Sequence, residues 1–172
     1  MEKSFNLTYF FLLFFFVTNI YAIDLKFAIY TSDKASVMYK QFKPIINYLE
    51  EDAKKQSIDL KISIKICPTY ESALEGIIKG YYDFARFGPA SYILAKRKNN
   101  NIRLLVMEEE KGRKVFNGVF IARKNSGIKT LKDLKNKSFA FGDQQSTVGR
   151  YLAQDEMLKV GLNSNILKIL NT

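Results

Sequence analysis

The chain has 172 residues, a formal net charge of +10, one cysteine and no histidine. A single cysteine excludes an intrachain disulfide scaffold, and the lack of histidine excludes His-based catalytic triads and most zinc sites. The basic residues are scattered along the chain, which is typical of solvated helix and loop faces rather than of a nucleic-acid-binding patch.

The N-terminal stretch has the pattern of a secretory signal peptide. Lys3 precedes an apolar run from Leu7 to Val17, and Ala22 supplies a small residue at the cleavage site. Residues 1–22 are therefore expected to direct export to the periplasm. An uncleaved membrane anchor is the alternative interpretation, although the run is short for a membrane span.

Apolar strands and amphipathic helices alternate through the next part of the chain. The expected strands are Leu25–Tyr30, Ile58–Ile66 and Tyr82–Phe87, and the expected helices cover 37–53, 69–78 and 92–98. Pro44 is expected to kink or restart the first helix. Ile102–Met107 and Val115–Ala122 are predicted as further strands. This βαβ alternation predicts an α/β fold with a largely parallel sheet.

A similar pattern follows the linker Asn125–Gly127. The expected elements are a short helix over 131–134 capped by Thr130, a strand over 138–141, a helix over 147–160 and the start of a strand over 165–170. The C-terminal part of the chain is thus predicted to be a second, smaller α/β unit.

Ser146 and Thr147 stand at the start of the last predicted helix, a few residues after an apolar strand and the turn at Gly142. A helix start presents unpaired backbone N–H groups and the positive end of the helix dipole. Two hydroxyl donors at that point suit a small oxyanion. The competing interpretation is an ordinary helix cap that holds no ligand.

Three further strand-to-helix junctions combine an aromatic residue with a hydroxyl group, at 30–32, 68–70 and 87–91. Ligands of open α/β sheets collect at the carboxyl ends of the strands. These junctions therefore predict a small polar ligand held by N–H and O–H donors and walled by aromatic rings. Tyr70 and Phe87 are the candidate wall residues, and core packing is the alternative for Phe87.

The sequence shows no recognisable catalytic constellation. Cys67 is interpreted as a half-buried thiol at a strand end rather than a nucleophile, because no histidine is present to activate it. Glu108–Glu110 is interpreted as a solvated turn rather than a metal site. We therefore expect no catalytic residue, no metal and no cofactor.

The order of several segments resembles a known family. The segments are Phe42–Pro44, Cys67–Tyr70, Tyr82–Tyr92, Leu131–Phe141 and Gln145–Thr147. Together they resemble the phosphate/phosphite/phosphonate substrate-binding proteins of ABC transporters, within the type 2 periplasmic-binding-protein fold. The resemblance extends over residues 24–170.

The resemblance implies two α/β lobes with the ligand in the cleft between them. With the N-terminal pattern, it divides the chain into a signal peptide at 1–22, a first lobe at 23–122, a crossing segment at 123–128 and a partial second lobe at 129–172. It implies that Ser146 and Thr147 bind the ligand oxygens and that Tyr70 and Phe87 line the cleft. Phe87 stands where tyrosine is frequent in the family, and Val148 stands where a third small polar residue is common.

The implied function is that of an exported, monomeric, non-enzymatic binding protein that delivers a small phosphorus oxyanion to an ABC permease, without contact with nucleic acid. The first lobe is expected to be nearly complete and the second only begun, as in a fragment of a longer frame or a truncated copy that does not bind. The alternative function is an extracytoplasmic ligand-sensing domain of a membrane histidine kinase or cyclase. An enzyme on the same fold, such as a thiamin-precursor enzyme, is disfavoured by the lack of histidine.

Overall fold

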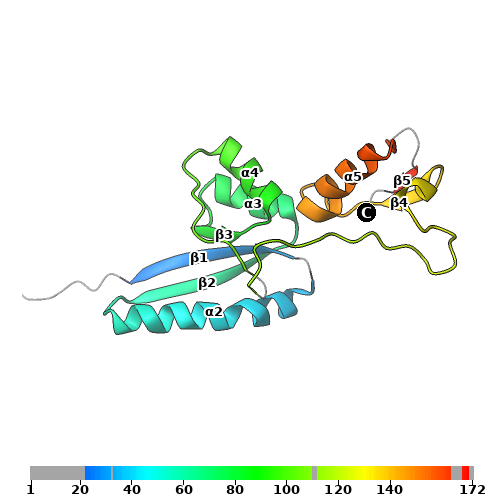
Figure 1. Ribbon diagram of the computed structural model, residues 1–172. Helices are drawn as coiled ribbons and strands as arrows, with labels where there is room; N and C mark the ends of the chain where they lie inside the picture. The colour runs from blue at the N-terminus through cyan, green and yellow to red at the C-terminus, as the bar shows by residue number, and fades with distance from the viewer. Residues whose placement is uncertain (1–21, 32, 110–111, 164–167, 171–172) are drawn as a thin grey trace, which may run out of the picture.

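The computed structural model describes residues 22–31, 33–109, 112–163 and 168–170 (Figure 1). The predicted signal peptide, except Ala22, lies outside the described residues. An N-terminal α/β unit is joined to a smaller C-terminal one by a long extended connection (Figure 1). Within the described ranges, none of the helices has both the length and the apolarity that crossing a membrane requires.

The N-terminal unit is built on a parallel sheet of order β2-β1-β3. Its strands are β1 (Ile23–Tyr30), β2 (Leu60–Cys67) and β3 (Phe84–Arg86). Phe27 in the central strand lies opposite Ile64 on one neighbour and Phe84 on the other. The predicted parallel sheet is confirmed, because each strand returns to the sheet through a helical crossover.

Helices cover both faces of this sheet (Figure 1): α2 (Ala35–Lys55) lies on one, and α3 (Tyr70–Ile78) and α4 (Pro89–Lys98) lie on the other. Alternate residues of β1 supply the two cores, since side chains alternate along a strand. Phe27 and Ile29 pack against α2, whereas Ala28 and Tyr30 face α3. One face of β1 therefore packs into the core beneath α2, and the opposite face places Tyr30 in the core beside α3.

Helix α2 runs through Pro44 without interruption, so it does not restart there. A proline inside a helix costs about 3 kcal/mol. Met38 and Phe42 before it and Ile46 after it are all buried against the sheet. Burial of each large apolar side chain contributes about 1.5–3 kcal/mol, which outweighs the cost of the proline.

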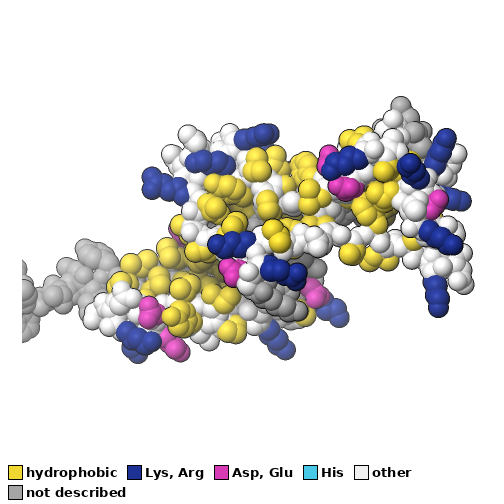
Figure 2. Space-filling model, viewed as in Figure 1, with side chains coloured by type: hydrophobic (Ala, Val, Ile, Leu, Met, Phe, Trp, Pro, Cys, Tyr) yellow, Lys and Arg dark blue, Asp and Glu magenta, His cyan; other side chains and the backbone are white. Residues whose placement is uncertain are grey.

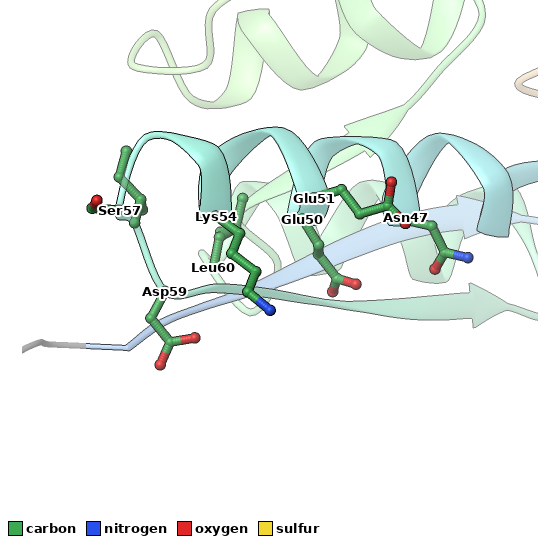
Figure 3. A pocket seen from close by; sticks show the side chains of 8 residues that line it. Asn47, Glu50, Glu51, Lys54, Ser57, Asp59 and Leu60 are labelled. Carbon is green, nitrogen blue, oxygen red and sulfur yellow. The ribbon is translucent and has the colours of Figure 1, made fainter.

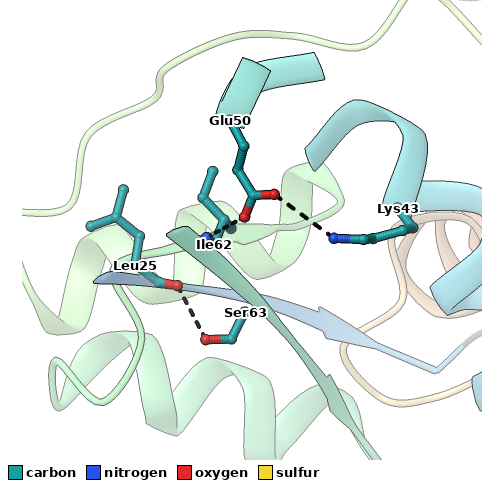
Figure 4. A network of polar contacts seen from close by, with 5 residues as sticks. All are labelled: Leu25, Lys43, Glu50, Ile62 and Ser63. Carbon is teal, nitrogen blue, oxygen red and sulfur yellow. Dashed lines mark hydrogen bonds and ion pairs between the residues drawn. The ribbon is translucent and has the colours of Figure 1, made fainter. Parts of the chain in front are cut away.

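A polar contact fastens α2 to the edge of the sheet (Figure 4). The Ile62 backbone N–H on the edge strand β2 donates to Glu50 Oε1 at 2.7 Å, and Lys43 Nζ lies 3.9 Å from Glu50 Oε2. Ser63 Oγ donates to the Leu25 carbonyl at 3.4 Å. A carboxylate that takes an outward-facing N–H makes this strand a poorer template for pairing with another chain.

The described residues of the C-terminal unit form two strands, three helical segments and a small core of their own. They are η1 (Leu131–Leu134, a 3₁₀ helix), β4 (Ser138–Ala140), η2 (Thr147–Leu152, a π-helical turn), α5 (Ala153–Lys159) and β5 (Lys168–Leu170). β4 and β5 pair in parallel. The predicted single helix over 147–160 is a π-helical turn that continues into α5, and residues 164–167 of the predicted last strand lie outside the described residues.

The two strands predicted at Ile102–Met107 and Val115–Ala122 are wrong. In the described structure both segments belong to the extended connection and enter neither sheet. They are strongly exposed, with Val106 at 83% and Ile121 at 86% of their full accessibility. A β pattern becomes a strand only where a neighbouring strand supplies ladder hydrogen bonds, and the described sheets supply none to these segments.

Gly76 lies in the middle of α3, where alanine would normally be the better helix former by about 1 kcal/mol. A Cβ atom there would overlap the ring of Tyr82, and the hydroxyl of that ring is held 3.6 Å from the Cys67 sulfur. We therefore expect Gly76→Ala to lower the free energy of unfolding by about 1–3 kcal/mol in urea denaturation. Glu75→Ala, at the exposed neighbouring position, should change it by about 0.5 kcal/mol or less. A Gly76→Ala variant more stable than wild type would contradict the packing described.

Candidate oxyanion-binding site

Two of the predicted junctions meet where the N-terminal and C-terminal units touch. The backbone N–H of Ala90, in the first turn of α4, donates to Thr147 Oγ1 at 3.0 Å. Ser91 Oγ, one residue further along α4, donates to the Gln145 carbonyl at 3.4 Å. The start of α4 and the start of η2 are thus in direct contact, although more than fifty residues separate them.

Aromatic rings form a wall beside this contact. The buried Tyr30 ring stacks on Tyr70, with 3.7 Å between ring centroids, and lies nearly parallel to Phe87 at 6.4 Å. A Cβ atom on Gly88 would stand 3.2 Å from Thr147 Oγ1 and 3.7 Å from the Tyr30 hydroxyl. Gly88 therefore lets the aromatic wall approach the hydroxyl group of the other unit closely.

The structure gathers the predicted site residues into one region: Tyr70 and Phe87 flank Tyr30, and Thr147 lies against Gly88 with Ser146 directly before it. Sequence reasoning did not include Tyr30 and Gly88 among the site residues. Their signal was present, since both lie at strand-to-helix junctions on the same edge of the sheet.

The two hydroxyl groups are held differently. Ser146 Oγ accepts from the Gly149 N–H at 3.1 Å, so Ser146 caps its own helical turn, as the competing interpretation expected. Thr147 instead caps α4, whose own N-cap residue, Gly88, has no side chain to do so. Both oxygens accept a backbone N–H, which leaves their hydroxyl hydrogens available for donation to an acceptor such as an oxyanion.

A glycine pair sets the position of the hydroxyl-bearing turn. The Gly142 N–H donates to the Gly149 carbonyl at 2.9 Å. A Cβ on either glycine would lie 3.2 Å from the Cα of the other. A side chain at either position would therefore require a shift of a few tenths of an ångström between the segment that follows β4 and the turn that carries Ser146 and Thr147.

Charge near the aromatic wall comes from Arg86. Its Nε and Nη2 atoms donate to the two carboxylate oxygens of Glu108 at 2.7 and 2.8 Å. The same guanidinium interacts electrostatically with Tyr30 and Tyr70. Burial and a hydrogen bond with Tyr70 hold the pKa of Tyr30 well above its usual value, so its hydroxyl stays protonated at neutral pH.

The Arg86–Glu108 pair predicts a modest acid sensitivity. The hydrogen bonds from Arg86 lower the pKa of Glu108 in the folded state below its ordinary value of 4.5. The stabilisation is therefore present above that value and is lost as the pH falls through the lowered folded pKa. Over this pH range we expect the free energy of unfolding to fall further in wild type than in Glu108→Gln. The difference should stay below about 1 kcal/mol, because Glu108 is 64% exposed. Equal acid sensitivity of the two proteins in urea denaturation would contradict this role.

Two hollows elsewhere on the N-terminal unit are poor oxyanion sites. The larger, of about 570 Å³, lies at the C-terminal end of α2 (Figure 3). It is lined by the carboxylates Glu50, Glu51 and Asp59 and by the single cation Lys54, so its charge disfavours an anion. The other, of about 390 Å³, has a mostly apolar lining that includes Leu25, Leu49, Ile62, Phe84 and Leu105. Figure 2 shows Lys and Arg side chains spread over the face drawn rather than gathered in one patch.

Solved structures share this fold. PhnD1 from Prochlorococcus marinus (MIT 9301), in complex with methylphosphonate, matches with a TM-score of 0.70 at 23% identity, over 84% of this chain and 53% of that one. A binding-protein component of an ABC phosphonate transporter from Pseudomonas aeruginosa matches with a TM-score of 0.68 at 18% identity, over 88% of this chain and 51% of that one. The fold is therefore that of the periplasmic binding proteins, over about half of their length, as the sequence predicted.

The family follows from the sequence itself. Residues 27–170 match the family described as ABC transporter, phosphonate, periplasmic substrate-binding protein. The chain belongs to this family of phosphonate-binding proteins, which confirms the resemblance noted above.

Two curated relatives are similar to parts of the chain. The probable ABC transporter phosphite binding protein PhnD1 from Prochlorococcus marinus (strain MIT 9301) is 31% identical over 118 residues, which are 64% of this chain and 39% of the relative. The phosphate-import protein PhnD from Mycolicibacterium smegmatis is 28% identical over 121 residues, which are 69% of this chain and 36% of the relative. The chain thus matches well under half the length of these relatives, which are named as binding and import proteins rather than enzymes.

Proposed function

We propose that this chain is an exported binding protein that captures a small phosphorus oxyanion for an ABC permease. The observation that carries the proposal is the hydrogen bond from the Ala90 N–H to Thr147 Oγ1. It joins the first turn of α4, which carries the positive end of a helix dipole, to a pair of hydroxyl donors on the other unit. The Tyr30, Tyr70 and Phe87 rings provide the wall beside these donors.

In this proposal Ser146 and Thr147 donate to the oxyanion, and Tyr70 and Phe87 line the side of the cleft. Residues 1–22 direct export to the periplasm, 23–122 and 129–172 belong to the two lobes, and 123–128 cross between them. The protein acts as a monomer and catalyses no reaction. Its affinity comes from closure of the two lobes around the ligand. The named relatives support phosphonate, phosphite and phosphate as the ligand class.

Isothermal titration calorimetry of the folded protein tests this proposal. Methylphosphonate, phosphite and phosphate are titrated separately, and sulfate serves as a tetrahedral anion without phosphorus. We expect saturable heat with at least one phosphorus oxyanion and tighter binding of it than of sulfate. A folded sample that gives no heat with any of the three phosphorus ligands would contradict the proposal.

A further inference from the structure

The loop and turn over residues 123–137, which we call the basic segment, hold half of the net charge of the chain. Lys and Arg side chains occur over the whole face drawn in Figure 2, but in this segment six cations accompany a single carboxylate, against a net charge of +10 for the whole chain. All six are exposed, and none of them forms an ion pair within the part of the chain that the structure describes. They are Arg123, Lys124, Lys129, Lys132, Lys135 and Lys137.

The short helix η1 turns part of this charge outward. Residues three apart lie one above the other in a 3₁₀ helix. Leu131 and Leu134 form the ridge that packs into the core of the C-terminal unit, so Lys132 and Lys135, on the next ridge, face solvent. The carboxylate of the segment, Asp133, accepts two backbone N–H groups at the start of η1, at 2.9 and 2.7 Å. It is therefore held at the helix cap rather than by a lysine ammonium group.

The basic segment lies away from the proposed oxyanion site. Figure 1 shows it in yellow, at the end of the molecule remote from the N-terminal unit. The two units meet instead at the start of η2, where the Ala90 N–H donates to Thr147 Oγ1. A surface bound through the basic segment therefore leaves the oxyanion site uncovered.

The charge of the segment selects an anionic partner, and two observations favour a lipid surface over an acidic protein. Five of the six cations are lysines, which are depleted in protein–protein interfaces but readily place their charged ends among lipid headgroups. Val119 and Ile121, just before the segment, are 79% and 86% exposed. Apolar side chains beside a group of cations are the combination by which segments bind at a membrane interface.

We propose that the basic segment is a membrane-docking surface that binds the headgroups of anionic phospholipids. Each lysine close to an anionic bilayer raises the affinity about fivefold, so three or more give a strong preference for anionic over zwitterionic lipid. The proposal goes beyond the proposed function, because docking does not depend on a bound oxyanion. For an exported binding protein, docking would keep the chain beside the membrane that carries its permease.

Titration with lipid vesicles, followed by sedimentation, tests this proposal on the full chain. One set of vesicles is pure phosphatidylcholine, and the other is an equal mixture of phosphatidylcholine and phosphatidylglycerol. Phosphatidylcholine gives the baseline, since apolar side chains, including those of residues 7–17, bind it without help from charge. We expect at least about tenfold tighter binding to the anionic vesicles at low salt. Most of this preference should disappear at about 1 M NaCl, where the Debye length falls to about 3 Å.

Two triple variants separate the basic segment from net charge alone. The first neutralises the lysines around η1: Lys129→Gln, Lys132→Gln and Lys135→Gln. The second makes the same change at exposed positions of the N-terminal unit: Lys54→Gln, Lys61→Gln and Lys65→Gln. The first should lower the affinity for anionic vesicles by about tenfold or more, and the second should stay within about threefold of wild type.

Equal affinity of wild type for the two kinds of vesicle, wild-type affinity in the first variant, or an equal loss in the second variant overturns the proposal. Poly-L-glutamate serves as an acidic polypeptide. If wild type binds it more tightly than it binds the anionic vesicles, the partner is an acidic protein and the membrane proposal is wrong. Methylphosphonate binding is a separate readout, so the proposed function can fail while the preference for anionic vesicles remains.

Discussion

Replacing Ser146 with alanine and Thr147 with valine together should lower the affinity for methylphosphonate by at least about 100-fold. Each hydroxyl is proposed to donate to a charged oxygen, and loss of such a hydrogen bond costs about 1.5–3 kcal/mol. Two losses therefore exceed the roughly 2.8 kcal/mol that corresponds to a hundredfold change. Calorimetry of the double variant beside wild type measures the effect.

A matched control separates binding from capping. Ser146 caps its helical turn and Thr147 caps α4, so the double variant also loses stability, on the order of 2 kcal/mol. Thr130 caps η1 in the same unit, where its backbone and hydroxyl groups bond to Asp133. Thr130→Val removes one cap, so it should lose about half as much stability and keep full affinity. A double variant that is folded and binds within threefold of wild type would contradict the assignment of the hydroxyl pair.

Ile29→Ala should lower the free energy of unfolding by about 2–5 kcal/mol. Ile29 lies in the central strand, is 0% exposed and packs with Met38 and Phe42 beneath α2. A cavity there removes contacts from the main core beneath a sheet in which the described residues supply three strands. Urea denaturation measures the loss.

The control for this prediction is Ile45→Ala on the outer side of the same helix. Ile45 is 53% exposed, so the substitution should change stability by less than about 1 kcal/mol. Equal effects at the two positions would contradict the assignment of α2 to this face of the sheet.

Local patterns were sufficient to predict most elements of the N-terminal unit. Thr69 caps α3, with Ser72 N–H donating to its hydroxyl at 3.0 Å, and Pro89 opens α4, three residues before the predicted start of that helix. Such signals depend on hydrogen bonds within one turn, so they are visible in a short window of sequence. The alternation in β2 likewise reports a strand with one face against α2.

Features that depend on distant residues were not predictable in the same way. Ile102–Met107 is apolar at nearly every position, as a buried strand would be, but strand formation requires a partner that the pattern cannot name. Thr147 is recognisable as a helix-start residue, but its bond to Ala90 depends on how two units meet.

A crystal structure of the protein with methylphosphonate tests the central claim most directly. The account predicts phosphonate oxygens within about 2.5–3.0 Å of both Ser146 Oγ and Thr147 Oγ1, with the Tyr70 and Phe87 rings beside the ligand. A phosphonate bound elsewhere in a complete difference map, with these hydroxyls making no contact to it, would contradict the account.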